Sequence, residues 1–477
     1  MEARSRRCPL QAPPRLLFWA EITSARRIIS RAMHTAAVST RRTALGNRGF
    51  RSVLLVIAGV PIALAYVWQG AVQPVLLGDL GDFTESYMPA AVRLSKGVDP
   101  YTLCATMGCL EPTGPQYVMP PVLAWMLQPL VGVDRVAVTV GVVLILNACL
   151  VAFVWLALRA LRVTDRQLAV LLMLVALGFE PVAANVLEGQ VNLVLLALSG
   201  AWLVAWVDDR WWGGAALGAA IALKLIQGPV ALLILWGRRW SMLAAAAAAG
   251  LILWLAGAPQ YLFEYLFRVL PAVSQGTGLF ENHSPGGTIT RLFDPNTFFA
   301  VRGSPVPARI LTALVALAAL AVTFYVLRSP AKGSRRRLLE AAAIVAVTPV
   351  VASYSWGTHL VLLLLPMFVL IDWSLRRSDW FVLGLVGWSW FCIGPAHKLM
   401  QQLLVTGYSD VAVLRVLAEA GVVGILCLWL ATLVAVRRSP DDLDPADQQR
   451  PEQKEHHRAR KDDPVAAVAV PSVEGID

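Results

Sequence analysis

The sequence predicts an all-α protein that crosses a membrane many times. Hydrophobic residues make up 57% of the 477 residues and charged residues only 15%, whereas a soluble domain carries about 25% charged residues. Long apolar runs recur from Val53 to Val436, and a spanning helix needs roughly 20 apolar residues. The runs are solidly apolar rather than alternating, which excludes an outer-membrane barrel. The same observations exclude a soluble enzyme, a disordered chain and a secreted disulfide scaffold.

Charge divides the chain into three regions. Residues 1–51 form a basic arm with eleven Arg and two acidic residues, and residues 437–477 form a tail with seven basic and ten acidic residues. Beside a membrane span, a basic arm indicates anchoring at an anionic cytoplasmic leaflet rather than nucleic-acid binding. The arm has no signal-peptide pattern, and Met33 is an alternative start. We therefore expect a plasma-membrane domain at 52–436 between a cytoplasmic arm and a disordered cytoplasmic tail.

Lys and Arg mark the loops expected on the cytoplasmic side and so order the predicted spans. About ten spans are expected, near residues 53–69, 134–158, 167–187, 190–207, 241–257, 308–327, 338–353, 359–371, 380–395 and 411–436. This order leaves two long loops outside the cell, at about 70–132 and 258–306. Both termini are then cytoplasmic.

The apolar stretch 213–236 does not fit a single span. Arg238 and Arg239 follow it and also favour the cytoplasmic side, yet the stretch is too short to cross twice. Lys224 and the segment 227–229 (Gln-Gly-Pro) lie in its middle; Gly and Pro break helices, and Lys is costly at membrane depth. We predict two half-helices that meet at a re-entrant break lining a cavity, which allows ten to twelve spans in all.

The same position makes Lys224 a candidate functional residue. A charged side chain within an apolar run is a functional candidate by default. The alternative is a structural ion pair, for example with Glu188.

The short cytoplasmic loops offer little chemistry. They hold no phosphate-binding glycine loop, and the acidic pair Asp208-Asp209 is typical of a solvated turn. The six Cys include no CxxC pair, although Cys104 and Cys109 could form a small structural disulfide. The six His show no HExxH spacing. We expect neither a metal nor a cofactor.

The first external loop carries candidate acids. Asp79, Asp82 and Glu85 follow the first span and lie beside the aromatic residues Phe83 and Tyr87. A partly desolvated carboxylate near cations suits a general base. The alternative is an acid at a helix N-terminus, favoured by the helix dipole.

Later segments on the same predicted side carry cations. They are ENHSPGGTITRLF with Glu281, Asn282, His283 and Arg291, SYSWGTH with His359, and PAHKL with His397 and Lys398. Cations that converge near an apolar rim suit the phosphate of a lipid headgroup. Lys and Arg at helix ends also snorkel to the interface without any function.

Four segments in order resemble one family. They are GDF…Y…AAVRLSKGVDPY with QYVMPPVLAWMLQPL, GQVNLVLLAL with WWGGAALGAAIALKLIQGPV, SPGGTITRLF, and SYSWGTHLVLLLLP. Together they resemble the bacterial C-type glycosyltransferases of family 87, membrane mannosyltransferases that use polyprenyl-phosphate-mannose, over most of residues 70–375. The sequence departs from the family at Gln227-Gly228-Pro229 and at the Cys104–Cys109 insertion.

The resemblance implies the C-type glycosyltransferase fold and a function outside the cell. It implies transfer of a sugar, mannose first, from a polyprenyl-phosphate donor to a cell-envelope glycolipid or polysaccharide, with inversion. Asp82 matches the family's catalytic base, while Lys224, Arg291 and His359 match positions near the donor phosphate. The secondary candidates are Asp79, Glu85, His283 and Asn282. The implied partners are the donor, the acceptor and membrane lipids, with no nucleic acid.

Three other functions remain open from the sequence. An arabinofuranosyltransferase would have the same architecture with another lipid donor. A transporter or flippase for a lipid-linked sugar would also need charges at the midplane and broken helices, but it predicts an inverted repeat that the sequence does not show. A non-catalytic scaffold would act through the arm and the tail.

Overall fold

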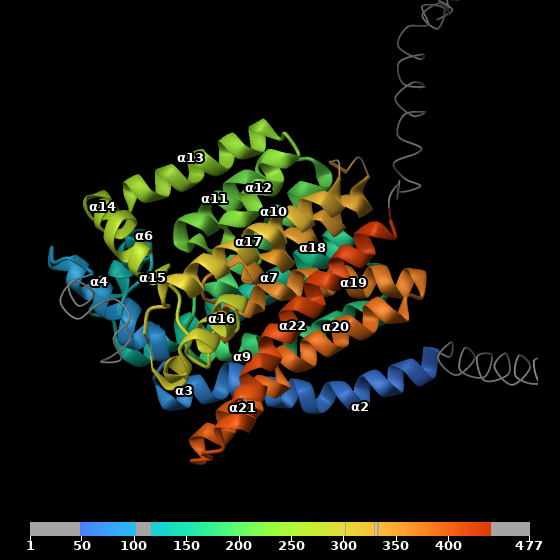
Figure 1. Cartoon of the computed structure of the whole chain (residues 1–477), viewed down its shortest axis with the longest axis horizontal. Coiled ribbons are helices and arrows are strands. Elements are labelled where there is room, and N and C mark those ends of the chain that lie inside the picture. Colours follow the sequence, from blue (N-terminus) through green and yellow to red (C-terminus); the bar gives the residue numbers. More distant parts are fainter. Residues whose placement is uncertain (1–47, 102–115, 301, 329, 332, 440–477) are drawn as a thin grey trace, which may run out of the picture. The chain divides into compact units, whose positions relative to one another are not determined.

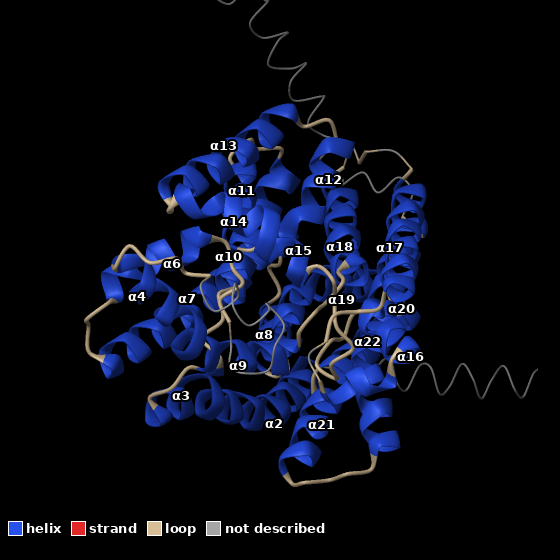
Figure 2. Ribbon diagram, turned by 60° about the vertical axis from the view of Figure 1, so that its left-hand side comes forward, coloured by secondary structure: helices blue, strands red, loops and turns tan. Residues whose placement is uncertain are grey.

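The computed structural model describes residues 48–101, 116–300, 302–328, 330–331 and 333–439. These residues are helical apart from loops, and the pairing of extended backbone in them is one isolated bridge between Thr277 and Gly303. Figure 2 shows helices joined by loops. The all-α prediction is therefore confirmed for the described ranges. The predicted Cys104–Cys109 disulfide, most of the basic arm and nearly all of the acidic tail lie outside them.

The chain divides into two compact units after Pro61. The described part of the first unit, residues 48–61, is the beginning of one helix, and the other elements belong to the second unit. The α-helices are α2 (Arg48–Val67), α3 (Gln73–Leu77), α4 (Met88–Ser95), α6 (Pro121–Leu127), α7 (Arg135–Leu161), α8 (Arg166–Leu177), α9 (Glu180–Leu187), α10 (Asn192–Asp208), α11 (Gly213–Leu223), α12 (Gly228–Trp236), α13 (Trp240–Ala256), α14 (Leu262–Glu264), α15 (Leu270–Val273), α16 (Pro285–Phe293), α17 (Val306–Leu327), α18 (Ser334–Val351), α19 (Leu364–Arg377), α20 (Trp380–Ile393), α21 (Pro395–Val405) and α22 (Val411–Arg437).

Short turns of other helix types join several of these helices. Three are π-helical, namely η1 (Trp68–Val72), η2 (Phe83–Tyr87) and η6 (Tyr265–Val269). Five are 3₁₀ turns, namely η3 (Gln128–Leu130), η4 (Leu225–Gln227), η5 (Pro259–Tyr261), η7 (Pro295–Phe299) and η8 (Gly357–Leu363).

The described residues contain five helices that are long and apolar enough to cross a membrane. They are Ser52–Leu77, Arg135–Leu161, Val306–Leu327, Gly357–Arg377 and Val411–Arg437. The count rises to as many as seven if two bent pairs, Arg166–Leu177 with Glu180–Leu187 and Trp240–Ala256 with Pro259–Val273, are each one span. The predicted ten to twelve spans are not confirmed. One reason is length, since α10 has 17 residues and α20 has 14, and 17 residues at 1.5 Å each fall short of a hydrocarbon core of about 30 Å.

Polar caps set where the long helices begin. Asp134 precedes α7 and its side chain accepts a hydrogen bond from the amide of Ala137 at 3.0 Å. Asp410 caps α22 through the amide of Ala412 in the same way. Such caps satisfy amide groups that have no partner within the helix. Helices α18, α19, α20 and α22 pack against one another (Figure 1).

Helices α11 and α13 approach each other closely because small residues line both (Figure 1). A Cβ on Gly214 would lie 1.8 Å from the carbonyl oxygen of Met242, and one on Gly218 would lie 2.1 Å from that of Ala246. On α13 the contact is made by small residues of the run 244–250, six Ala followed by Gly250, with Ala246 and Gly250 facing Gly218. Small residues at such spacing allow close helix packing in membrane proteins.

The predicted break in the stretch 213–236 is confirmed. Helix α11 ends at Leu223, Lys224 is extended with φ −159° and ψ 121°, and α12 starts at Gly228 with Pro229 in its first turn. Pro fits there because the first turn needs no amide donor. The path of the two halves relative to a membrane stays a prediction.

Candidate active site

A cavity of about 570 Å³ gathers residues from segments that are far apart in the sequence. We call it the central cavity. The first long loop, the α9–α10 turn, the break between α11 and η4, the second long loop and the segment between α18 and η8 all contribute to its wall. The polar residues that matter most for its chemistry are Asp82, Glu188, Gln190, Lys224, Glu281 and His359.

Gln190 connects Asp82 to Lys224. Its side-chain amide donates a hydrogen bond to Asp82 Oδ2. Its Oε1 accepts one from the hydroxyl of Tyr87 at 2.7 Å and a longer one from Lys224 Nζ at 3.4 Å. The carboxylate and the ammonium group are thus held near each other without direct contact.

Lys224 is 5% exposed, and its partners are amides. Besides Gln190, its Nζ donates to Asn192 Oδ1 at 2.9 Å. No ion pair with Glu188 is found among the described residues. The alternative explanation of Lys224 as the partner of Glu188 is therefore not what the structure shows. An ammonium group has three N–H donors, so one remains for a ligand.

Two glycines let the loop of Asp82 pack on the α9–α10 turn. Gly81 has φ +33°, and a Cβ there would lie 1.9 Å from Glu188 Oε2. Gly189 has φ +61°, and a Cβ there would lie 2.5 Å from Phe83 Cβ. The amide of Asp82 donates to Glu188 Oε2 at 3.3 Å. Positive φ with no room for a side chain explains glycine at both positions.

Burial dominates the electrostatics of the carboxylates in the central cavity. It raises the pKa of Asp82 above its ordinary value of 3.8, although the charge of Lys224 and the hydrogen bond from Gln190 act in the opposite direction. Burial and then the charge of Asp82 raise the pKa of Glu188 to about 7. The same two causes raise the pKa of Glu281. Loss of hydration disfavours a charged carboxylate, so a buried acid of this kind is a stronger base than an exposed one.

His359 faces the same cavity and is 4% exposed. Its ring lies 5.8 Å from the ring of Tyr354. The segment is fixed to α9 because the side-chain amide of Asn185 donates to the carbonyl oxygen of Thr358 at 2.7 Å. The cavity thus brings together three of the four main predicted site residues, Asp82, Lys224 and His359.

Arg291, the fourth, does not line the central cavity. Its Nε and Nη2 both lie 2.7 Å from Glu419 Oε1. Its Nη1 donates to the carbonyl oxygens of Leu279 at 3.1 Å and Asn282 at 3.2 Å. These contacts tie α16 to α22 and to the loop before α16, and they favour a structural role.

The secondary candidates also lie outside the cavity wall. Asp79 pairs with Arg135 at 3.4 Å, and Glu85 is exposed. Asn282 is fully buried and joins two loops, since its Nδ2 donates to the carbonyl oxygen of Thr277 at 2.7 Å and its Oδ1 accepts from the amide of Ser355 at 2.9 Å. His283 packs its ring 4.5 Å from that of His397. Among the described residues, no three His, Cys, Asp or Glu side chains are grouped to hold a metal ion.

Sequence reasoning did not select Gln190 and Glu281 as site residues. Glu281 was named in the ENHS string without a role, and Gln190 in the GQVN string was not named. One sequence feature could have identified Gln190: it lies two residues from Asn192, and both are amides beside a turn in an otherwise apolar region. Both turn out to contact Lys224.

The central part of the chain matches a known family. Residues 117–353 match the model of Glycosyltransferase family 87. This match, with the relatives described next, supports a glycosyltransferase of family 87. Gln190, Lys224 and Glu281 lie within the matched segment, while Asp82 precedes it and His359 follows it.

Curated relatives carry two different activities in their names. The chain is 27% identical over 260 residues to an alpha-(1->3)-arabinofuranosyltransferase of Mycobacterium tuberculosis, which covers 51% of this chain and 59% of the relative. It is 29% identical over 237 residues to a polyprenol-phosphate-mannose-dependent alpha-(1-2)-phosphatidylinositol mannoside mannosyltransferase of Mycolicibacterium smegmatis, which covers 46% of this chain and 52% of the relative. The chain therefore spans little more than half the length of these relatives.

Proposed function

We propose that the chain is a membrane glycosyltransferase that transfers mannose from a polyprenyl-phosphate donor. The acceptor is a cell-envelope glycolipid or polysaccharide on the extracytoplasmic side of the plasma membrane. The observation that carries this proposal is the arrangement of Asp82, Gln190 and Lys224 in one cavity. A base and a cation held close but apart can serve the attacking hydroxyl and the leaving phosphate of one reaction.

In this reaction, Asp82 takes the proton of an acceptor hydroxyl as that oxygen attacks the anomeric carbon of the donor sugar. The bond between the anomeric carbon and the phosphate oxygen breaks, and the phosphate leaves with the electron pair. Attack from the face opposite the phosphate inverts the anomeric centre. The proton then passes from Asp82 to solvent, which restores the base.

Lys224 and His359 stabilise the leaving phosphate. Lys224 keeps one N–H donor for a phosphate oxygen after its bonds to Asn192 and Gln190. Little water screens these donors because both residues are buried, and fixed donors aimed at developing charge are most effective where water is excluded. Arg291 supports the phosphate-binding part of the cavity indirectly: it holds the loop at 278–282 and does not touch the donor.

The second candidate is transfer of arabinofuranose from a polyprenyl-phosphate donor. The relative named as an arabinofuranosyltransferase favours it, and the polar groups of the central cavity suit either sugar. A transport function would use the same lipid-linked sugar without forming a new glycosidic bond.

The test is a transfer assay on membranes that contain the full chain. Radiolabelled polyprenyl-phosphate-mannose is incubated with wild type, with Asp82→Asn and with the control Asp79→Asn, whose carboxylate pairs with Arg135 outside the cavity. We expect label in a glycolipid or polysaccharide product with wild type and Asp79→Asn. Asp82→Asn should lose about 10²–10⁴-fold of the rate, the usual contribution of a general base.

Full activity of Asp82→Asn would remove this residue from the mechanism. Movement of labelled donor across the membrane without a new product would favour a transporter. Repeating the assay with the arabinose donor decides between the two sugars.

A further inference from the structure

The central cavity contains a second group of polar residues that the proposed chemistry does not use. Glu180 from α9 and His397 from α21 both line the cavity wall. The start of α21 packs on the start of α9, since a Cβ on Gly394, three residues before His397, would lie 3.6 Å from Glu180 Cβ. His397 also borders the His359 segment, because its Nε2 lies 3.1 Å from the position of a Cβ on Gly357.

One polar atom on each of these two side chains lacks a hydrogen-bond partner among the described residues. Glu180 Oε2 and His397 Nδ1 are buried and have no hydrogen-bond partner. His397 is 3% exposed. Most buried polar groups in proteins have a partner, and leaving one unpaired is costly. By contrast, Gln190 and Lys224 are held by the protein itself. Unpaired groups on a cavity wall indicate that a ligand completes their bonds.

Aromatic rings lie beside these polar groups. Tyr354 and Trp356 line the same cavity, and their rings lie 5.9 Å apart at an angle of 53°. Trp356 immediately precedes Gly357, the residue that borders His397. Aromatic surface combined with a few hydrogen-bonding groups is the usual lining of a small-molecule site. A sugar ring fits both features, because it has apolar C–H faces and a rim of hydroxyls.

The charge of Glu180 determines whether Glu180 and His397 can bind a phosphate or a neutral ring. Glu180 is a carboxyl group, and an ionised carboxylate accepts hydrogen bonds but repels a phosphate. The donor phosphate therefore belongs with Lys224 and His359. A neutral ring that offers hydroxyl donors suits Glu180 and His397.

We propose that Glu180, His397 and the pair Tyr354–Trp356 form a subsite for the acceptor, which binds a neutral, hydroxyl-rich ring. We call it the acceptor subsite. It rests on the proposed function and places the acceptor in the same cavity as Asp82. The carboxyl group and the imidazole orient the ring by its hydroxyls, and one further hydroxyl is presented to Asp82.

The first test separates acceptor binding from donor binding. Transfer from radiolabelled polyprenyl-phosphate-mannose to octyl α-D-mannopyranoside is measured for wild type, Glu180→Gln and His397→Phe. We expect KM for the octyl mannoside to rise about tenfold or more in each variant, in line with loss of one hydrogen bond to a buried group. KM for the donor should change less than twofold.

A matched control is Glu264→Gln. Glu264 pairs with Arg268 on an exposed part of the chain at 2.6 Å and does not line the cavity. It should leave both KM values unchanged. An unchanged acceptor KM in Glu180→Gln, or equal rises in the two KM values, would overturn the acceptor subsite.

The second test needs no transfer activity. The purified chain in detergent is heated with methyl α-D-mannopyranoside or with inorganic phosphate, and the shift in Tm is recorded. We expect the mannoside to raise the Tm of wild type and Asp82→Asn but not that of Glu180→Gln. Phosphate should act alike on wild type and Glu180→Gln.

The two tests fail in different ways. If no variant transfers mannose or arabinose but the mannoside shift still depends on Glu180, the proposed function fails and the subsite stands. If wild type transfers sugar but the acceptor KM and the mannoside shift do not depend on Glu180 or His397, the subsite fails and the function stands. A Glu180→Gln variant with lower Tm in buffer alone is judged by its mannoside shift relative to its own baseline.

Discussion

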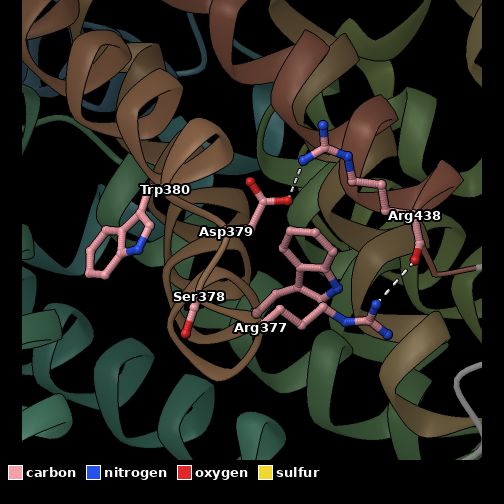
Figure 3. A pocket seen from close by; sticks show the side chains of 6 residues that line it. Arg377, Ser378, Asp379, Trp380 and Arg438 are labelled. Carbon is pink, nitrogen blue, oxygen red and sulfur yellow. Dashed lines mark hydrogen bonds and ion pairs between the residues drawn. The ribbon is translucent and has the colours of Figure 1, made fainter. Parts of the chain in front are cut away.

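The central cavity and a second pocket among the described residues both contain charged side chains, but they differ in whether the protein pairs those charges. The second is a pocket of about 440 Å³ where the α19–α20 turn meets the end of α22, which we call the arginine pocket (Figure 3). It is lined by Trp373, Arg377, Ser378, Asp379, Trp380 and Arg438. Asp379 pairs with Arg438, and Arg377 Nη1 donates to the carbonyl oxygen of Arg438 at 3.1 Å.

In the central cavity, by contrast, several polar side-chain atoms have no partner. Three polar atoms on its wall, Glu180 Oε2, His359 Nδ1 and His397 Nδ1, are buried without a hydrogen-bond partner among the described residues. The acids of the two pockets differ accordingly. Burial alone would raise the pKa of Asp379. The hydrogen bond from Arg438, the charge of Arg438 and the hydrogen bonds from the backbone of Val382 and Phe381 together outweigh burial and lower the pKa. In the central cavity, burial outweighs the charge of Lys224 and the hydrogen bond from Gln190, and the pKa of Asp82 is raised.

The comparison shows that charge in a pocket does not by itself indicate function. In the arginine pocket the charges hold the end of α22 to the rest of the chain. In the central cavity the charges remain available to a ligand. Perturbed acids in a cavity are candidates for chemistry, whereas ion pairs of this kind are usually structural.

Replacing the buried cation should have the largest effect. Lys224→Met removes the charge that we assign to the leaving phosphate, while its length and apolar stem are kept. We expect kcat/KM for mannose transfer to fall about 10²–10³-fold, the usual cost of one preorganised electrostatic group. The control is Lys96→Met, which changes an exposed Lys outside the cavity. Normal transfer by Lys224→Met would show that the cavity does not need its cation.

Removing the amide that joins Asp82 to Lys224 should have a smaller effect. Gln190→Leu abolishes the hydrogen bonds to Asp82, Tyr87 and Lys224. We expect kcat to fall about 10–100-fold, because a misplaced base loses part of the advantage of orientation. The hydrogen bond from Gln190 lowers the pKa of Asp82, so its loss should move the acid limb of the pH–rate profile to higher pH.

The matched control for this variant is Gln227→Leu. Gln227 is also buried, at 2% exposed, and donates to Ser199 Oγ at 2.9 Å, but it does not line the cavity. If Gln190→Leu and Gln227→Leu lose the same activity with unchanged pH profiles, the role of Gln190 is only structural.

The pH–rate profile of wild type should itself have an acid limb at higher pH than an exposed Asp would give. Asp82 acts as a base only when it is ionised, and burial raises its pKa above 3.8. The activity should therefore fall with decreasing pH around a midpoint higher than that of an exposed Asp. Glu85→Gln removes a nearby negative charge that also raises the pKa of Asp82, so it should move the midpoint to lower pH. A profile with no acid limb above pH 3.8 would contradict the assignment of Asp82 as base.

Much of this arrangement could be predicted from the sequence, for identifiable reasons. The helix positions follow from hydropathy, because a helix buried in lipid needs a continuous apolar run. Lys224 and His359 stood out since polar residues are rare inside such runs. The number of spans could not be predicted, because hydropathy does not show where a helix such as α8 ends and α9 begins; the bend there is 53°.

The role of Arg291 shows a second limit. Its partner Glu419 lies 128 positions later in the chain, and nothing in the local string SPGGTITRLF indicates that pairing. A buried Arg that holds two helices together has the same sequence signature as one that binds phosphate. Gln190 was missed for the reverse reason, since a neutral amide carries no charge to mark it.

The smallest expected effect lies in the arginine pocket. Asp379→Asn removes the ion pair with Arg438 but keeps a polar group that can still accept from the amide of Val382, as Asp379 does at 3.2 Å. Because the folded pKa of Asp379 is lowered, its pairing stabilises the protein above pH 3.8, and the contribution is lost as the pH falls through the lower folded value. The Arg438 side chain is 49% exposed, so we expect a loss of about 1 kcal/mol or less, seen as a slightly lower Tm in detergent at pH 7. Sugar transfer should stay within twofold of wild type. If Asp379→Asn instead abolished transfer at unchanged Tm, paired charges would matter to the reaction as much as unpaired ones, and the division between the two pockets would fail.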